Sequence, residues 1–276
     1  MPDCYPELNE TQRAIRDTAR RIVARELTPH VAKLERQEEL PYPYIKRLAG
    51  ALGMDGAGEL TEAMSLAAPE DHLEFFVPAA VAIEISRVCG GVLVSYGVSY
   101  GQVAGTIRRY GTPAQVERWV PGLMSGEIVG AWGLTEPGAG SDAFGSMRTT
   151  ARADGDHYVL NGQKTFITNA PYADVFVVYA RLEDGASRSI QPFLLERGTA
   201  GLDVSKPFRK MGTHSSPTGA VYLDHRDLPQ RPVALTRAPG VSLCFLFLGR
   251  AGVDPRWPPD RLEQRRILAA RAPHAA

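Results

Sequence analysis

Apolar residues recur at helical spacing near the start of the chain. The face that they form consists of Ile15, Ala19, Ile22, Val23 and Leu27. A repeat of three to four residues is typical of a helix with one buried side. Asn9 and Gln12 form a capping-box pattern that predicts the start of this helix, and Pro29 is expected to stop it.

Further segments continue the helical pattern. Residues 42–52 predict a second helix, whereas residues 55–72 are rich in Gly, Ala and acidic side chains and predict a loop. Residues 75–110 are small and apolar almost without a break, which is typical of buried helices. Thr112 is expected to cap a last helix that ends before Gly126. The first part of the chain therefore predicts an all-helical domain.

Past residue 129 the apolar runs shorten to the length of strands. The segments DVFVVYARL, QPFLLER and GAVYLDH are rich in β-branched and aromatic residues, and turn signals separate them. In HYVLNGQKTFITNA, Asn161-Gly162 stands between two strand-like runs, which predicts a β-hairpin. Residues 130–228 therefore predict an all-β module, either a sandwich or a barrel.

From about residue 230 the chain is rich in Pro, Arg and Ala. Only RLEQRRILAARA has helical periodicity there, and a segment of this composition buries little apolar surface. The predicted fold class is α+β. Its regions are a helical domain at residues 1–129, a β-domain at 130–229 and a divergent tail at 230–276.

Charge and cysteine content argue against several classes of function. Lys plus Arg and Asp plus Glu both number 31 in the 276 residues, whereas nucleic-acid binding needs a basic surface. Cys4, Cys89 and Cys244 are far apart, so we expect neither a disulfide framework nor a metal site. The N-terminus has no signal-peptide pattern, and the apolar run VSLCFLFLG is shorter than the ~20 residues of a membrane helix. These features predict a cytoplasmic protein with no membrane partner.

The stretch GAWGLTEPGAGSDAFGS, residues 130–146, concentrates glycine and small polar residues in one bend. In one interpretation the glycines only permit positive φ angles at a corner between strands. In the other they let backbone N–H groups approach an anionic or heteroaromatic ligand, with Thr135 and Ser141 adding hydroxyl groups. The stretch is neither a Walker loop, since no Lys follows the glycines, nor a Rossmann fingerprint, since no βαβ unit surrounds it.

Three blocks of sequence resemble the acyl-CoA dehydrogenase family. GLTEPGAGSDAFG, Gly133 to Gly145, is similar to the family signature, and Tyr158 to Arg181 resembles part of its β-domain. FRKMGTHSSPTGAVYLDHRDLP resembles the stretch that closes that domain. The order of a helical domain followed by a β-domain is also that of the family. The resemblance covers residues 7 to about 229.

The resemblance implies that the bend binds FAD. Trp132, Leu134 and Thr135 match positions that meet the flavin ring, and Gly140 and Ser141 match positions at the pyrophosphate. Ser141 also matches a contact to the acyl-CoA substrate. A second flavin contact is implied for the pair Phe166 and Thr168, where Phe166 replaces the larger Trp of many family members.

The resemblance implies the α,β-dehydrogenation of an acyl-CoA thioester, a step of fatty acid metabolism. A carboxylate removes the α-proton and the β-hydrogen leaves as hydride to FAD. An electron-transfer flavoprotein or a similar acceptor is the implied partner. The family is homo-oligomeric, but the domain that forms its oligomer contacts is expected to be missing here.

The end of the chain departs from the family pattern. In the family, a C-terminal four-helix bundle follows the β-domain and carries the catalytic glutamate, and no such bundle is predicted here. Glu136 belongs to the signature but is not the family's base, and Glu263 has no matching context. We therefore assign no catalytic residue, and expect a chain that is weak or inactive alone.

One hypothesis is that residues 230 onward are translated out of frame, because LGRAGVDPRWPP can be re-read one nucleotide later as LEERAWILAGHL. The alternative is a naturally short protein with a divergent tail. Two other functions stay open: a chain that binds FAD or acyl-CoA without catalysis, as a remnant or as one subunit of a split enzyme, and a flavin oxidase or monooxygenase of the same fold.

Overall fold

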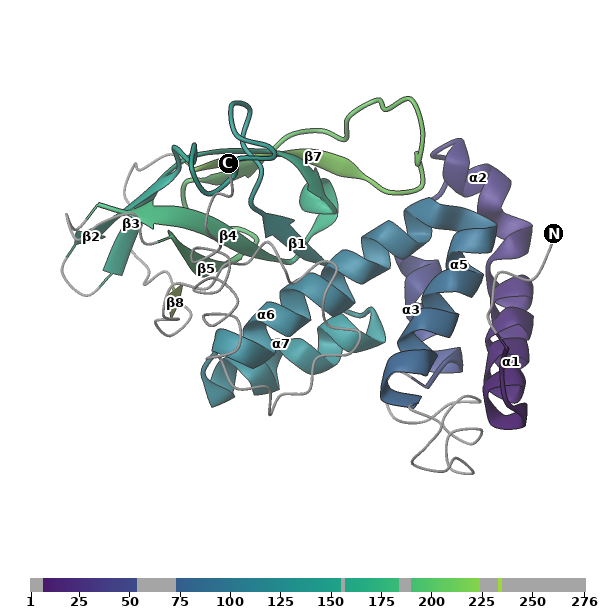
Figure 1. Ribbon diagram of the computed structural model, residues 1–276. Coiled ribbons are helices and arrows are strands. Elements are labelled where there is room, and N and C mark those ends of the chain that lie inside the picture. The colour runs from purple at the N-terminus through teal and green to yellow at the C-terminus, as the bar shows by residue number, and fades with distance from the viewer. Residues whose placement is uncertain (1–6, 54–72, 155–156, 184–189, 224–232, 235–276) are drawn as a thin grey trace, which may run out of the picture. The chain divides into compact units, whose positions relative to one another are not determined.

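The computed structural model describes residues 7–53, 73–154, 157–183, 190–223 and 233–234 (Figure 1). Helices form the first part of the described chain and strands form the second. The described residues of both parts belong to one compact unit. The prediction of a helical domain followed by a β-domain is confirmed. The predicted loop at 55–72 and nearly all of the tail lie outside the described residues.

The first helix begins and ends where its sequence predicts. In α1 (Glu10–Glu26), the Asn9 side chain accepts from the Gln12 N–H at 2.8 Å, and the Gln12 side chain accepts from the Asn9 N–H at 3.3 Å. The chain then turns through η1 (Thr28–His30), which contains Pro29, into α2 (Val31–Glu35). The residues of α1 that are buried are Ile15, Ala19, Ile22 and Val23.

The helices at 42–52 and after Thr112 are also confirmed. They are α3 (Tyr42–Ala51) and α7 (Pro113–Ser125). Thr112 and Gln115 form a second capping box, and Gly126 ends α7 with a left-handed φ of 74°. The start and the end of α7 each depend on residues within one turn of each other, so local sequence is enough to predict them.

The apolar run at 75–110 forms α5 (Leu73–Gly97), the π-helical segment η3 (Val98–Val103) and α6 (Ala104–Tyr110). Phe76–Tyr110 is long and apolar enough to cross a membrane by length and composition, a test that the core helix of a soluble protein also passes. VSLCFLFLG, the apolar run named from the sequence, is therefore not the longest apolar stretch of the chain. Phe76–Tyr110 is longer because consecutive helices join there, although Glu84 and Arg87 interrupt the apolar residues. Val81, Ile85 and Val92 lie in the helical core that also contains the buried face of α1.

The β-domain is a mixed sheet of eight strands in the order β6-β7-β3-β2-β4-β5-β8, with β1 beside β4. The strands are β1 (Gly130–Gly133), β2 (Thr150–Asp154), β3 (His157–Thr168), β4 (Val175–Leu182), β5 (Ile190–Glu196), β6 (Leu202–Val204), β7 (Thr218–Leu223) and β8 (Val233–Ala234). The segments predicted as β-rich form β4, β5 and β7. Strand β8 was not predicted, because the tail around it has no strand pattern.

The predicted hairpin at Asn161-Gly162 is wrong. Both residues lie inside β3, whose first half pairs with β2 and whose second half pairs with β7. Gly162 has a φ of 150°, and a Cβ on it would lie 2.5 Å from Thr149 Oγ1. Glycine is therefore required because the strand passes close to Thr149 as it changes partners, not because the chain turns.

Candidate functional site

The glycine-rich bend leaves and re-enters the sheet along one edge of β4. Strand β1 pairs in parallel with the first half of β4, and β2 pairs in parallel with its end, where Thr150 lies opposite Arg181. Residues 134–149 therefore connect β1 to β2. Both of these strands pair with β4, one after the other along its length. The small residues of the bend lie in this connection between β1 and β2.

The bend contains two closed turns. The Glu136 and Ala139 N–H groups each donate to the other residue's carbonyl, at 3.0 and 3.1 Å, around Pro137-Gly138. Farther on, Asp142 Oδ1 accepts from the Gly145 N–H at 3.2 Å and its Oδ2 accepts from the Ser146 hydroxyl at 2.6 Å. Both turns are built from residues of the bend itself.

The glycines of the bend do not serve positive φ angles, so that interpretation is wrong. Among the described residues, the glycines with positive φ are Gly53, Gly126, Gly162, Gly198 and Gly201. A Cβ at Gly138 or Gly140 would meet no atom of the described residues within 4 Å. The fold therefore leaves open space at Gly140, where a ligand can approach the backbone.

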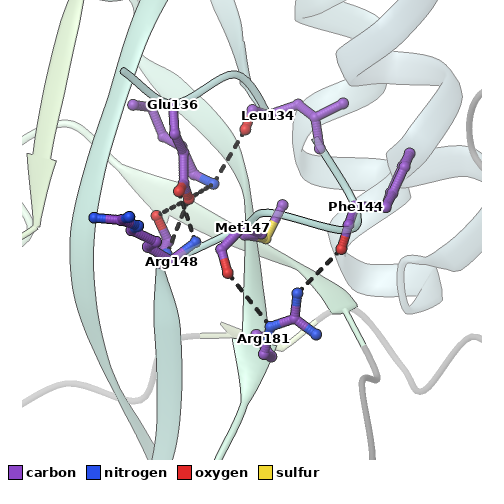
Figure 2. A network of polar contacts seen from close by, with 8 residues as sticks. Leu134, Glu136, Phe144, Met147, Arg148 and Arg181 are labelled. Carbon is purple, nitrogen blue, oxygen red and sulfur yellow. Dashed lines mark hydrogen bonds and ion pairs between the residues drawn. The ribbon is translucent and has the colours of Figure 1, made fainter. Parts of the chain in front are cut away.

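Glu136, a residue of the bend (Figure 2), forms a buried ion pair with Lys164 of β3. Lys164 Nζ lies 2.8 Å from Glu136 Oε1, and both side chains are almost fully buried. The carboxylate also accepts from the Arg148 N–H at 2.7 Å, the Thr149 N–H at 2.9 Å and the Thr149 hydroxyl. Sequence reasoning identified Glu136 only as part of the signature and missed its partner, which lies 28 residues away.

These contacts set the charge of the pair. Burial favours the protonated form of Glu136, but the hydrogen bonds from Lys164, Thr149 and the backbone outweigh it and hold the pKa below its usual value. Burial lowers the pKa of Lys164 to about 8, against the raising effect of Glu136. Both groups are therefore mainly charged at pH 7.

Strand β3 holds the start of the bend. Lys164 Nζ donates to the Leu134 carbonyl at 3.2 Å, and the Thr165 N–H donates to the Thr135 carbonyl at 2.9 Å. Two of the residues that the resemblance implies for the flavin ring, Leu134 and Thr135, are thus joined to the strand that carries Phe166. The structure brings these two separate blocks of sequence together.

Phe166 is presented to the outside by an irregularity in β3. Its side chain is 69% exposed, and its φ is 56°, which is uncommon for a bulky residue. The pairing of β3 with β7 shifts register between Lys164 and Ile167, so Phe166 occupies a β-bulge. Its ring meets Phe208 edge-on at 5.8 Å between centroids. A Phe in a strand usually packs in the β-core, but Phe166 is not buried there.

The other implied site residues have different surroundings. Trp132 lies on β1 and packs edge-on against Tyr179, at 5.1 Å between ring centroids. Thr168 is half-buried and lies opposite Thr218 at the end of β3. Gly140 and Ser141 are exposed beyond the Pro137-Gly138 turn. The position of Trp132 is explained by packing, whereas that of Ser141 is open to a ligand.

Arg181 holds the second half of the bend. Its guanidinium donates to the carbonyls of Phe144 at 3.0 Å and Met147 at 3.4 Å (Figure 2). Lys164 on β3 and Arg181 on β4 thus hold the first and second halves of the bend. Sequence reasoning gave Arg181 no role, because it lies 34 residues from Met147 along the chain.

Asn169, directly after the implied flavin contact at Thr168, was also missed. It is fully buried with a left-handed φ of 68°. Its amide donates to the carbonyls of Ser95 and Gly130, each at 2.9 Å. Asn169 therefore ties the end of β3 to α5 and to β1.

Two family models match the chain. The acyl-CoA dehydrogenase N-terminal domain matches residues 9–127, and the acyl-CoA dehydrogenase middle domain matches residues 131–225. Together they account for the described helices from α1 to α7 and for strands β1 to β7.

Curated relatives agree with these matches. A mitochondrial short-chain specific acyl-CoA dehydrogenase of Bos taurus is 34% identical over 90% of this chain and 59% of its own length. A glutaryl-CoA dehydrogenase of Desulfococcus multivorans is 32% identical over 86% of this chain and 60% of its own length. The chain spans about three fifths of the length of these relatives.

Solved structures have the same fold. A glutaryl-CoA dehydrogenase of Mycobacterium smegmatis in complex with FADH2 is similar with a TM-score of 0.72 and 31% identity, over 87% of this chain and 58% of that one. An acyl-CoA dehydrogenase of Bacillus anthracis complexed with FAD gives a TM-score of 0.64 and 31% identity, over 86% and 39% of the two chains. Sequence blocks, fold and family matches agree, and the chain belongs to the acyl-CoA dehydrogenase family.

Proposed function

We propose that this protein binds FAD at the glycine-rich bend and beside Phe166. The observation that carries the proposal is the exposure of Phe166 on a β-bulge next to the segment Leu134–Thr135. A bulky residue with positive φ is tolerated where function requires it, and an exposed aromatic ring can stack on a planar heteroaromatic ligand. The relatives that hold FAD or FADH2 support this choice of ligand.

The residues of the chain have distinct roles in this proposal. Thr135 and Thr168 supply hydroxyl groups to the flavin ring, and Trp132 and Leu134 line its surroundings. Gly140 lets the backbone approach the pyrophosphate, since no atom of the described chain fills the space beside it. Ser141, exposed at the same place, contacts the pyrophosphate and the acyl-CoA.

The proposed reaction class is the α,β-dehydrogenation of an acyl-CoA thioester. FAD, when bound, supplies the acceptor for the hydride that leaves the β-carbon. We propose residues 1–129 as the N-terminal helical domain and 130–229 as the middle domain that holds the cofactor. An electron-transferring flavoprotein as acceptor and a cytoplasmic location belong to the same proposal.

A binding protein without dehydrogenase activity is the second candidate. The observation that favours it is that Glu136, which is not the family's base, is also not free to replace that base. Glu136 is buried, ion-paired with Lys164 and bonded to two backbone N–H groups, so it cannot reach a substrate as a base. We assign no base among the described residues.

The visible absorption spectrum tests both candidates. We expect the purified chain to bind added FAD and to give a flavin band that can be titrated to one equivalent. Bleaching of this band by short, medium or long acyl-CoA under anaerobic conditions would support the dehydrogenase. A stable band that no acyl-CoA bleaches would support the binding protein. A chain that takes up no FAD at any concentration would contradict both.

A further inference from the structure

Three successive residues at the start of the bend are attached to β3. Lys164 Nζ donates to the Leu134 carbonyl at 3.2 Å and to Glu136 Oε1 at 2.8 Å. Between them, the Thr135 carbonyl accepts from the Thr165 N–H at 2.9 Å. The backbone of Leu134–Glu136 therefore cannot shift without breaking contacts to two neighbouring residues of β3.

The same strand presents Phe166 in the opposite direction. Residues two apart in a regular strand lie on one face, yet Lys164 is fully buried and Phe166 is 69% exposed. The bulge and the positive φ of Phe166 account for this reversal. A few residues of β3 thus hold the bend through hydrogen bonds and expose an aromatic ring.

The hydrogen bond to Leu134 also determines a backbone direction. In a planar trans peptide, the C=O and the following N–H point in opposite directions. Since the Leu134 carbonyl points to the Lys164 ammonium, the Thr135 N–H points away from it. The contact with Lys164 thereby fixes the direction of one backbone donor of the bend.

We propose that Lys164 is a positioning residue for the flavin-binding segment, acting through the Leu134 carbonyl and the Glu136 carboxylate to set the backbone of Thr135. This inference rests on the proposed FAD site. Lys164 does not touch the cofactor in this role. It joins the two segments that do, and it holds the Thr135 N–H in the direction that a ligand can use.

The opposing explanation is that the pair only stabilises the fold. Glu84 offers a matched comparison in the helical part of the chain, because it is also buried and accepts from Arg20 at 3.0 and 3.1 Å. Neutralising either carboxylate removes the charge of a buried glutamate that accepts from a cation, although the Arg20 side chain is 38% exposed and Lys164 is fully buried. Only the pair at Glu136 is joined to the bend, so only its loss is expected to change the bend.

The test compares Lys164→Met, the double variant Lys164→Met with Glu136→Gln, and Glu84→Gln as control. Lys164→Met leaves the Glu136 carboxylate without its cation, which is strongly destabilising in a core. The double variant removes both charges, so we expect its Tm to return to within about 3 °C of the wild type. If Lys164→Met does not fold, the double variant alone decides.

Two measurements are made on each variant. Hydrogen–deuterium exchange of residues 131–139 in the FAD-free chain reports how firmly the bend is held. Titration with FAD reports the consequence, and we expect about tenfold weaker binding by the double variant, with Glu84→Gln unchanged. Faster exchange of the bend in the double variant, despite its recovered Tm, would support the positioning role.

If the double variant recovers both the Tm of the wild type and its slow hydrogen exchange at residues 131–139, the inference is wrong. The ion pair would then contribute only to stability. Unchanged FAD affinity in a double variant with a loosened bend would overturn it too. If the wild-type chain binds no FAD, the proposed function fails, while the exchange measurement still decides whether Lys164 holds the bend.

Discussion

The side-chain amide of Asn169 lies 2.9 Å from the carbonyl oxygen of Ser95 and joins the end of β3 to helix α5. The same amide reaches the Gly130 carbonyl at 2.9 Å, and the Tyr42 hydroxyl donates to the Asn169 side-chain oxygen at 3.3 Å. One fully buried side chain thus serves partners in helical and β parts of the fold. Its loss leaves several polar groups without their partner at once.

Asn169→Ala is expected to destabilise the protein by about 2–4 kcal/mol, because buried carbonyls lose their donor and Ala disfavours the left-handed φ. Urea unfolding measures the difference. Asn169→Gly separates the two causes, since Gly accepts the backbone conformation but lacks the amide. Equal stability of Asn169→Gly and wild type would show that the amide contributes nothing.

Gly162→Ala is expected to cost more than Gly198→Ala, although both glycines have a positive φ. A Cβ at Gly162 would lie 2.5 Å from Thr149 Oγ1 and 2.7 Å from its Cα, whereas a Cβ at Gly198 would meet no atom of the described chain within 4 Å. We expect about 1 kcal/mol for Gly198→Ala from backbone strain alone, and at least about 2–3 kcal/mol for Gly162→Ala. Thermal unfolding compares them, and equal losses would contradict a role for the contact with Thr149.

Phe166→Gly is expected to raise stability and weaken FAD binding. Gly relieves the cost of the left-handed φ, about 1 kcal/mol, and an exposed ring contributes little to the core. The lost ring removes the proposed platform for the flavin. Unfolding and FAD titration are measured on the same preparation. A variant that retains full affinity for FAD would remove Phe166 from the site.

Gly140→Val is expected to leave the free energy of unfolding within about 0.5 kcal/mol of wild type, since its side chain would extend into open space. FAD binding should weaken, because the branched side chain would fill the space in which we propose that the pyrophosphate of FAD lies. Thermal unfolding serves as the internal control for the FAD titration. A large loss of stability would mean that the bend itself requires glycine there.

Glu136→Gln is expected to change how stability depends on pH. The pKa of Glu136 is held below its usual value of 4.5, so its charge stabilises the fold fully above that pH and less as pH falls through the lower folded value. Wild type should therefore exceed the variant in stability at pH 6, and the gap should narrow towards pH 3. Urea midpoints across this range measure it. A difference in stability between wild type and variant that does not change with pH would contradict the lowered pKa of Glu136.

Local sequence alone determined several elements. The capping boxes at Asn9 and Thr112 and the left-handed end of α7 at Gly126 involve residues within a few positions of each other, so no distant contact was needed to predict them. The family resemblance likewise depended on short blocks, above all Gly133 to Gly145. These signals were enough to predict a helical domain followed by a β-domain and the position of the bend between the first two strands.

Only the tertiary structure decided how distant residues meet. Asn161-Gly162 has the local signature of a turn, but pairing with β2 and then β7 keeps it inside one strand, and glycine serves the passage by Thr149. Lys164 looks like an ordinary polar residue of a strand until the fold places Glu136 beside it. Pairing across the sheet decides burial and hydrogen bonding, and these contacts depend on where the chain returns rather than on its neighbours in sequence.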